Sequence, residues 1–314
     1  LHYTLNAPRQ YRVFSSILKE QRIDVVVAAH VLAGAAVIRA AKNAKVPVVF
    51  DLKDWFPDSA AAYYTNPALK WLIREGVWAV TRYNLDRSDR ITTVSPSLVD
   101  QLKRHGYDAQ CITNGVDTDY FKPLDGRPMR ERLGLAQEDY VLGFAGSLER
   151  WYALGGVIDA LPRIIERLPN ARLLIVGDSL FTSYRQELEE QARRLGLADR
   201  VVFTGSVAYR ELPGYIAAMD LCLIPLAPPQ WVNIALPNKF FEYSACGKPI
   251  LSTPIPDVAR IGGPHLSIYR DAGEFLDMVH RLAAHRETFN VDVSGCSWKK
   301  KAEEFEGILA RLAA

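Results

Sequence analysis

The chain has 314 residues, 49% hydrophobic and 24% charged, which is enough for two domains with cores of their own and argues against a disordered protein. Its 38 Lys and Arg against 36 Asp and Glu leave a net charge of +2, which argues against nucleic acid as a partner. Four scattered cysteines form no C-x-x-C pair, and no apolar run approaches the roughly 20 residues that span a bilayer. We therefore expect a cytoplasmic protein.

Short β-branched runs alternate with stretches of helical period, a pattern typical of parallel sheets covered by helices. In the first part of the chain, we expect strands at 24–29, 46–51, 90–94 and 110–113. We expect helices between them at 33–43, 67–85 and 96–105. The last two begin with Asn66-Pro67 and Ser95-Pro96, in which a capping residue precedes proline at the first helical position.

The segment 113–126, TNGVDTDYFKPLDG, is dense in turn-forming residues, and we place the domain boundary there. A second series follows, with strands expected at 140–145, 172–176, 200–204, 221–224 and 249–252. Its helices are expected at 157–167, 184–195, 210–218, 238–246 and 272–284. The predicted domains are 1–118 and 119–295, and a C-terminal helix at 296–314 is expected to pack back on the first domain.

Two turns after expected strands combine glycine with polar neighbours. Gly146 and Ser147 follow the first strand of the second series, with Arg150 close behind, and Gly177 and Asp178 follow the next strand. Glycine lets a backbone approach a ligand closely, and Ser and Arg donate hydrogen bonds to anionic oxygens. Ordinary strand-to-helix turns are the alternative interpretation. No G-x-G-x-x-G follows any strand, which argues against a dinucleotide cofactor.

The segment 237–249, PNKFFEYSACGKP, is more informative. It opens a helix after Pro237 and places Lys239 and Glu242 in the first turns. A carboxylate there interacts favourably with the helix dipole, so Glu242 has a purely structural interpretation as well. However, a carboxylate also accepts two hydroxyl hydrogen bonds, which is what ribose presents, and Lys239 can neutralise phosphate as a point charge.

Six segments lie in an order and spacing that resemble family 4 of the retaining GT-B glycosyltransferases. They are Ser95-Pro96-Ser97, ITNGVD at 112–117, Gly146-Ser147-Leu148, LLIVGD at 173–178, VVFTGSV at 201–207 and PNKFFEYSACGKPI at 237–250. The resemblance covers residues 24–249. It implies an α/β protein with two Rossmann-like, doubly wound parallel-sheet domains that face a cleft.

The resemblance also implies a donor site for a nucleotide-diphosphate sugar, UDP- or GDP-linked, in the second domain. Its residues are Gly146, Ser147, Gly177, Asp178, Ser206, Val207, Pro237, Asn238 and Glu242. Glu242 matches the second glutamate of the family's E-x7-E motif, which holds the ribose, and Gly146 with Ser147 matches the turn facing the diphosphate. Ser206 and Val207 match the loop that meets the base.

In the first domain, DLKDWFP at 51–57 resembles the loop that faces the donor sugar and the acceptor. Lys53 and Asp54 are the catalytic candidates in it. Three departures accompany the resemblance. Ile234 stands where the family has the first glutamate, and the family's opening strand does not precede Leu1. The family's R…KG pair is also absent, since Ser147 replaces the arginine and Trp151-Tyr152-Ala153 occupies the lysine-glycine region. Arg150 and Lys239 are the available cations for phosphate, and we expect the first domain to lack its opening strands.

The function that follows is transfer of a sugar to an acceptor hydroxyl with retention of configuration and without a bound metal or other cofactor. The expected acceptor is a saccharide or a lipid-linked group in surface polysaccharide or glycolipid synthesis, with peripheral contact at the inner face of the membrane. A noncatalytic nucleotide-sugar-binding paralogue and a GT-B nucleotide-sugar epimerase are the alternatives. The tryptophans Trp55, Trp71 and Trp78 form an acceptor or membrane-facing surface in one interpretation, but helical spacing favours core packing for Trp71 and Trp78.

Overall fold

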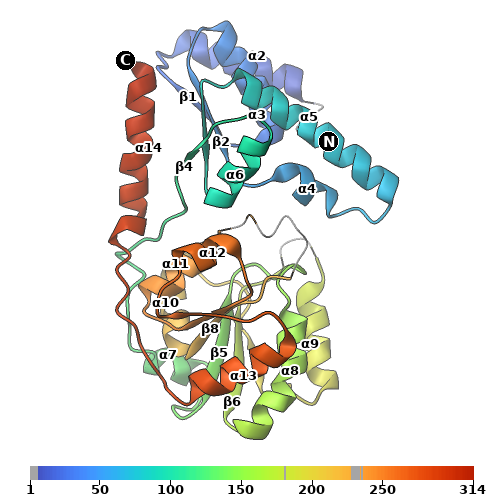
Figure 1. Cartoon of the computed structure of the whole chain (residues 1–314), viewed down its shortest axis with the longest axis vertical. Helices are drawn as coiled ribbons and strands as arrows, with labels where there is room; N and C mark the ends of the chain where they lie inside the picture. Colours follow the sequence, from blue (N-terminus) through green and yellow to red (C-terminus); the bar gives the residue numbers. More distant parts are fainter. Residues whose placement is uncertain (1–5, 180–181, 228–233, 235) are drawn as a thin grey trace. The chain divides into compact units, whose positions relative to one another are not determined.

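The computed structural model describes residues 6–179, 182–227, 234 and 236–314 (Figure 1). The chain forms two compact units, each with its own parallel sheet. Unit 1 comprises Leu1–Thr113 and Lys299–Ala314, and unit 2 comprises Asn114–Trp298.

Unit 1 is built on a four-stranded parallel sheet with the order β1-β2-β3-β4. The strands are β1 Val26–Ala28, β2 Val48–Leu52, β3 Arg90–Thr93 and β4 Gln110–Cys111. The helices are α2 Ala7–Glu20, α3 Val31–Asn43, α4 Phe56–Ala61, α5 Pro67–Arg87, α6 Pro96–Arg104 and α14 Trp298–Ala313. Strand β2 is buried along its whole length, which explains its uninterrupted apolar run.

Side-chain caps start α5 and α6, as the Asn-Pro and Ser-Pro pairs predict. Asn66 Oδ1 accepts hydrogen bonds from the N–H groups of Ala68 and Leu69 at 3.0 and 3.1 Å. Ser95 Oγ accepts from Leu98 N–H at 3.2 Å. These bonds satisfy N–H groups that the first turn leaves without helical partners, so the two helices begin where the sequence indicates.

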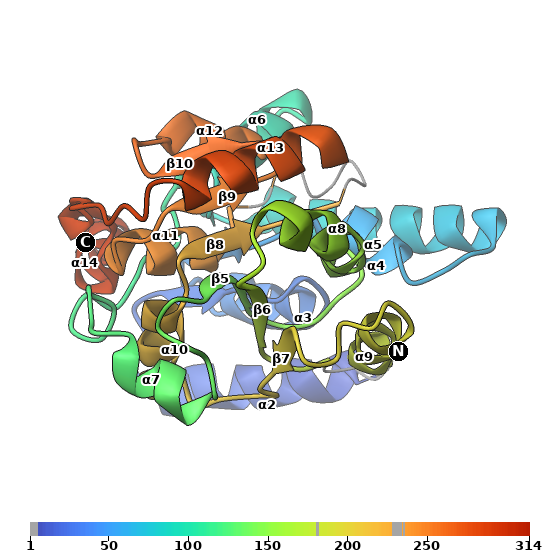
Figure 2. The same cartoon turned by 90° about the horizontal axis from the view of Figure 1, so that it is seen from below.

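Unit 2 is built on a six-stranded parallel sheet with the order β10-β9-β8-β5-β6-β7 (Figure 2). The strands are β5 Tyr140–Ala145, β6 Ala171–Val176, β7 Val201–Phe203, β8 Leu221–Ile224, β9 Ile250–Ser252 and β10 Leu266–Ile268. The helices are α7 Arg127–Arg132, α8 Leu154–Arg167, α9 Tyr184–Arg194, α10 Leu212–Ala218, α11 Asn238–Ala245, α12 Pro256–Ile261 and α13 Ala272–Ala283, with short 3₁₀ turns at Tyr209–Glu211 and Ser294–Cys296.

Helices cover both faces of this sheet, and alternate side chains of each strand enter two separate cores. Along β5, Tyr140, Leu142 and Phe144 pack with α8, α9 and α13. Val141 and Ala145 face the other core, to which α10, α11 and α12 contribute. The carboxyl ends of β5, β6 and β7 therefore rest on a rigid layer, which fixes the turns that follow them.

The units divide between Thr113 and Asn114, five residues before the predicted boundary at residue 118. Val116 belongs to unit 2 because its N–H donates to Cys296 O at 2.8 Å and its carbonyl accepts from Trp298 N–H at 3.0 Å. This pairing also keeps residues 296–298 in unit 2, whereas residues 299–314 group with unit 1. The boundary thus depends on backbone hydrogen bonds between segments that are far apart in the sequence, and such bonds cannot be predicted from composition.

The predicted strands and helices are present with ends shifted by a few residues. Helix α2 was not predicted, and four short elements were missed as well. They are α4, α7, α12 and β10. Each has at most six residues, too few for a helical or strand period to emerge. The three helices nevertheless carry proline in their first turn, at Pro57, Pro128 and Pro256, which is a start signal that sequence reasoning could have used.

A buried histidine in unit 2 links stability to pH. Ser244 Oγ donates to Phe240 O at 2.6 Å and lies 2.8 Å from His265 Nε2, so it accepts a hydrogen bond from the N–H group of that nitrogen. His265 Nδ1 has no hydrogen-bond partner in the described part of the chain, and the residue is only 4% exposed. Burial lowers the pKa of His265 because a charged imidazolium there would lose its water.

We expect unit 2 to lose stability as the pH falls below about 6.5, the ordinary histidine value. The unfolded chain then binds a proton that the folded chain resists, so the contribution is complete above that pH and is lost in acid, by at most about 1.4 kcal/mol per pH unit. The measurement is urea unfolding at pH 7.5 and 5.5 for the wild type and for His265→Gln. An equal loss in both proteins would show that His265 does not cause the dependence.

Candidate functional site

Three glycine turns meet at the carboxyl ends of β5, β6 and β7. Gly146, Gly177 and Gly205 have φ values of +146°, +133° and +72°, which side chains rarely adopt. Gly146 N–H donates to Val176 O at 2.9 Å, and Gly177 N–H donates to Gly205 O at 3.0 Å. A Cβ atom on Gly177 would lie 1.9 Å from Gly146 O, so only glycine permits this approach.

Helix α11 places Lys239 over the first of these turns. The side chain is 6% exposed, and its Nζ lies 3.8 Å from the ring centroid of Tyr152 and 4.8 Å from that of Phe144. A Cβ atom built on Gly146 would be 3.1 Å from the same Nζ. Within the described residues, Lys239 has no carboxylate partner. Its charge is therefore held by aromatic faces and directed at the Gly146 turn.

Tyr243 ties the same helix to the end of β5. Its phenolic oxygen accepts a hydrogen bond from Ala145 N–H at 2.8 Å, and the side chain is fully buried. This bond satisfies the last N–H of the strand, which has no ladder partner at that point. Helix α11 and the Gly146 turn are consequently fixed relative to each other.

Glu242 is one turn along α11 from Lys239, at a spacing that puts both on one face of the helix. The residue is partly buried, and its carboxylate makes no hydrogen bond or ion pair to any part of the chain that the structure describes. The pKa of Glu242 lies above its ordinary value because burial removes water from the carboxylate, and the nearby charge of Lys239 offsets only part of this rise. Both carboxylate oxygens thus remain acceptors for a ligand that brings its own donors.

The other predicted donor-site residues of unit 2 are placed around these elements. The carboxylate of Asp178 is occupied within the turn, since it accepts from Ser179 N–H and pairs with Arg185 at 2.8 Å. Ser147 is partly buried and Ser206 is exposed. The remaining members of the set are Val207, which packs on the core, Pro237, which caps α11, and Asn238, which is its exposed first residue.

The structure separates the two cations proposed for phosphate. The Arg150 side chain is 63% exposed and pairs with Glu187 at 2.5 Å, so its charge is already compensated at the surface. Lys239 lies at the turn and is uncompensated. In unit 1, Lys53 and Asp54 are exposed just after β2, and Lys53 Nζ pairs with Asp51 at 2.5 Å.

Sequence reasoning missed the residues that hold Lys239 in place. The aromatic faces of Phe144 and Tyr152 come from β5 and from the loop that replaces the lysine-glycine of the family pattern. The sequence did contain a signal: two aromatic residues, Trp151 and Tyr152, stand where the family pattern has its lysine. Its meaning depends on a contact between residues 87 positions apart, Tyr152 and Lys239, which no local pattern reveals.

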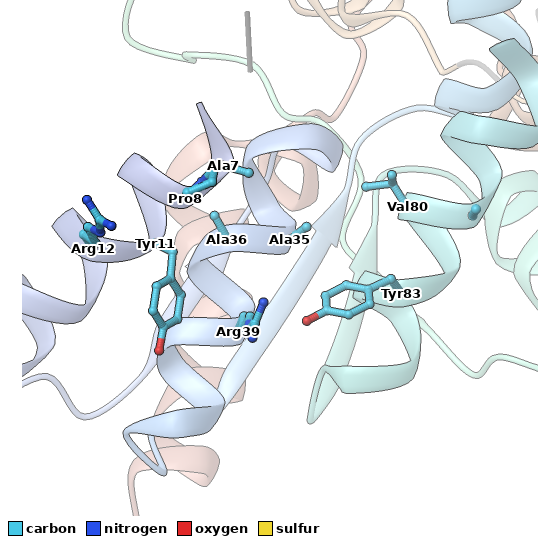
Figure 3. A pocket seen from close by; sticks show the side chains of 10 residues that line it. Ala7, Pro8, Tyr11, Arg12, Ala35, Ala36, Arg39, Val80 and Tyr83 are labelled. Carbon is cyan, nitrogen blue, oxygen red and sulfur yellow. The ribbon is translucent and has the colours of Figure 1, made fainter. Parts of the chain in front are cut away.

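A separate hollow of about 710 Å³ lies in unit 1, with walls from α2, α3 and α5 (Figure 3). Arg39 points between Tyr11 and Tyr83, and its guanidinium lies 5.5 Å from the Tyr11 ring centroid. None of the predicted site residues lines this hollow.

Two properties of the described residues bear on metals and on membranes. No group of three or more His, Cys, Asp or Glu side chains is placed to bind a metal ion. No helix there combines the length and apolar character that crossing a bilayer requires.

Comparison with known families matches most of the chain. Residues 139–285 match the family "Glycosyl transferases group 1", and residues 2–120 match "Glycosyltransferase Family 4". D-inositol 3-phosphate glycosyltransferase 2 of Catenulispora acidiphila is 27% identical over 254 residues, which are 72% of this chain and 57% of that protein. The chain spans about half the length of the curated relatives it matches.

A GDP-mannose-dependent alpha-(1-6)-phosphatidylinositol monomannoside mannosyltransferase of Mycolicibacterium smegmatis is 35% identical over 142 residues, 44% of this chain and 36% of that protein. Among solved structures, Anabaena Alr3699/HepE in complex with UDP and glucose aligns with a TM-score of 0.77 and 20% identity, covering 96% of this chain and 81% of that one. Sucrose-phosphate synthase from Thermosynechococcus elongatus aligns with a TM-score of 0.80 and 16% identity, covering 98% and 78%.

The two structural matches confirm the predicted GT-B fold, with two Rossmann-like units. The two family matches lie on the same units and in the order that the sequence resemblance implied. The chain belongs to the group 1, or family 4, glycosyltransferases.

Proposed function

We propose that this chain is part of a glycosyltransferase that binds a nucleoside-diphosphate sugar at unit 2 and transfers the sugar to an acceptor hydroxyl with retention. The observation that carries the proposal is that α11 presents two groups on one face, beside the glycine turns: the buried ammonium of Lys239, which has no ion-pair partner among the described residues, and the carboxylate of Glu242, which makes no hydrogen bond to them. The first fits a diphosphate and the second fits a ribose.

The diphosphate would lie at the Gly146 turn beneath Lys239 Nζ. Glycine there lets a phosphate oxygen approach the backbone, and a cation already stripped of water needs no reorganisation to meet the charge that builds on the leaving group. The nucleoside diphosphate would leave and the acceptor oxygen would enter on the same face of the sugar, with the hydroxyl proton passing to the leaving phosphate oxygen, so the configuration would be retained. Lys239 acts in this step by stabilising the leaving phosphate.

Glu242 would accept the two ribose hydroxyls, and the turn at Gly205, with Ser206 and Val207, would border the base. A uracil or a guanine base is the expectation. A relative is named for GDP-mannose, and a similar structure holds UDP with glucose. No metal ligand is required, because Lys239 supplies the positive charge at the phosphates.

The acceptor would lie against unit 1, where Lys53 and Asp54 follow β2. A lipid-linked acceptor in surface polysaccharide or glycolipid synthesis is the favoured class, since the Mycolicibacterium smegmatis relative is named for a phosphatidylinositol acceptor. Such an acceptor would bring the protein to the cytoplasmic face of a membrane.

The ribose assignment is tested by Glu242→Ala. Loss of the hydroxyl bonds to the carboxylate should weaken nucleoside-diphosphate affinity at least about tenfold, because even one hydrogen bond to a charged group contributes about 1.5–3 kcal/mol. Calorimetric titration with UDP and GDP measures it, and the 2′,3′-dideoxy nucleotide serves as the control, since it should bind both proteins equally. Unchanged affinity for the ribonucleotide would refute the role of Glu242.

Donor hydrolysis separates an enzyme from a module that only binds. With the preferred nucleotide sugar found by thermal shift, a transferase should release the nucleoside diphosphate slowly even without acceptor. Binding of the donor with no release of nucleoside diphosphate would instead support the noncatalytic alternative.

A further inference from the structure

Large apolar side chains are exposed where α4 turns into α5. Trp71 is 64% exposed and Leu72 is 59% exposed, and Tyr63, Tyr64 and Leu69 are exposed beside them in the chain. We call these five residues the hairpin tip. In Figure 1 the first half of α5 extends beyond the sheet of its own unit. Trp78, about two turns beyond Trp71 along α5, is partly buried and contacts Trp55 and His105.

This arrangement corrects the core-packing interpretation of Trp71. Helical spacing gave Trp71 and Trp78 the same face, but Trp78 is partly buried against Trp55 and His105, whereas Trp71 is 64% exposed. The half of the helix that carries Trp71 therefore keeps a large aromatic side chain in water. Such apolar clusters on a protein surface mark sites of interaction.

Charge indicates what kind of surface meets the tip. Lys70 is the only charged residue from 59 to 73, and the neighbouring Arg74 is paired with Asp58 at 3.0 Å. Unit 1 has 19 Lys and Arg against 13 Asp and Glu, whereas unit 2 has 19 against 23. The small net charge of the whole chain is therefore the sum of a basic unit 1, which carries the hairpin tip, and an acidic unit 2.

We propose that the hairpin tip inserts into the headgroup region of a membrane that contains anionic lipids. Trp and Tyr rings favour the boundary between headgroups and acyl chains, and Leu side chains favour the layer beneath it. A basic unit is drawn to an anionic surface and is repelled by a second copy of itself. This inference locates the membrane contact of the proposed function, but it does not depend on the donor site.

The test is cosedimentation of the full chain with vesicles of phosphatidylcholine, with and without phosphatidylglycerol. The wild type should bind the anionic vesicles, and the binding should weaken as salt is raised. The double variant Trp71→Ser with Leu72→Ser should bind about tenfold more weakly. Lys70→Glu should weaken binding to anionic vesicles and leave binding to neutral vesicles unchanged.

The control is Leu195→Ser with Ile261→Ser, which removes two exposed apolar side chains from unit 2. It should bind vesicles as the wild type does. Circular dichroism melts and UDP or GDP titration should be the same for all variants, so a defect in the donor site would be recognised separately.

Equal vesicle binding by the wild type and the tip variant would overturn the proposal. So would a wild-type dimer that the tip variant converts to a monomer in gel filtration, because the tip would then be covered by a second copy.

Discussion

Lys239→Met should reduce donor turnover by roughly 10²–10³-fold, the range seen when one preorganised charge stabiliser is removed from an active site. The ammonium of Lys239 is buried among aromatic faces and lies beside Gly146, so water cannot replace it in the same position. Methionine keeps the length and apolar body of the side chain. The variant should therefore fold normally, since removing a buried uncompensated charge does not cost stability.

The measurement compares nucleoside-diphosphate and nucleoside affinities in the wild type and in Lys239→Met. Affinity for the diphosphate should fall, whereas affinity for the nucleoside should stay the same, because only the phosphates meet the ammonium. Arg150→Met is the matched control: its guanidinium is exposed and paired with Glu187, so its loss should change donor turnover less than about threefold, as for other surface ion pairs. Equal losses in both variants would contradict the distinction.

The contrast between Lys239 and Arg150 shows how far the sequence determines the site. The segment 237–249 indicated the helix, the glutamate and the lysine, because all three lie within one short element with clear start and stop signals. Choosing between the two cations required the neighbours of each, and those come from Tyr152 and Glu187, far away in sequence. Local patterns name the candidates, and tertiary packing decides which charge is compensated.

The fold shows the same division. Fully buried strands such as β5 and β8 were predicted at their observed ends, because a parallel strand covered on both faces is a continuous apolar run whatever its length. Short elements such as α12 and β10 were not predicted, since few residues carry too little periodicity. Trp71 was misassigned for a related reason: helical period shows that side chains share a face, but it does not show whether a neighbour covers that face.

Gly177→Ala should destabilise unit 2 by about 3–5 kcal/mol, which is large for a single methyl group. The added Cβ would lie 1.9 Å from Gly146 O, and both positions are backbone, so neither can rotate away. The φ of +133° adds strain that an alanine must also bear. Relief requires the β5 and β6 turns to separate, which would move Gly146 away from Lys239.

Gly196→Ala is the matched control for Gly177→Ala, because it separates backbone strain from collision. Gly196 lies in the same unit with φ +70°, but a Cβ there meets no atom within 4 Å. Its substitution should cost about 1 kcal/mol, the penalty of a left-handed alanine alone. Urea unfolding gives both free energies, and nucleoside-diphosphate titration of whatever remains folded reports on the site. If the two substitutions lower the free energy of unfolding equally, the close approach of Gly177 to Gly146 does not determine the geometry of these turns. The hydrogen bond of Tyr243 on α11 would then be what positions the diphosphate site.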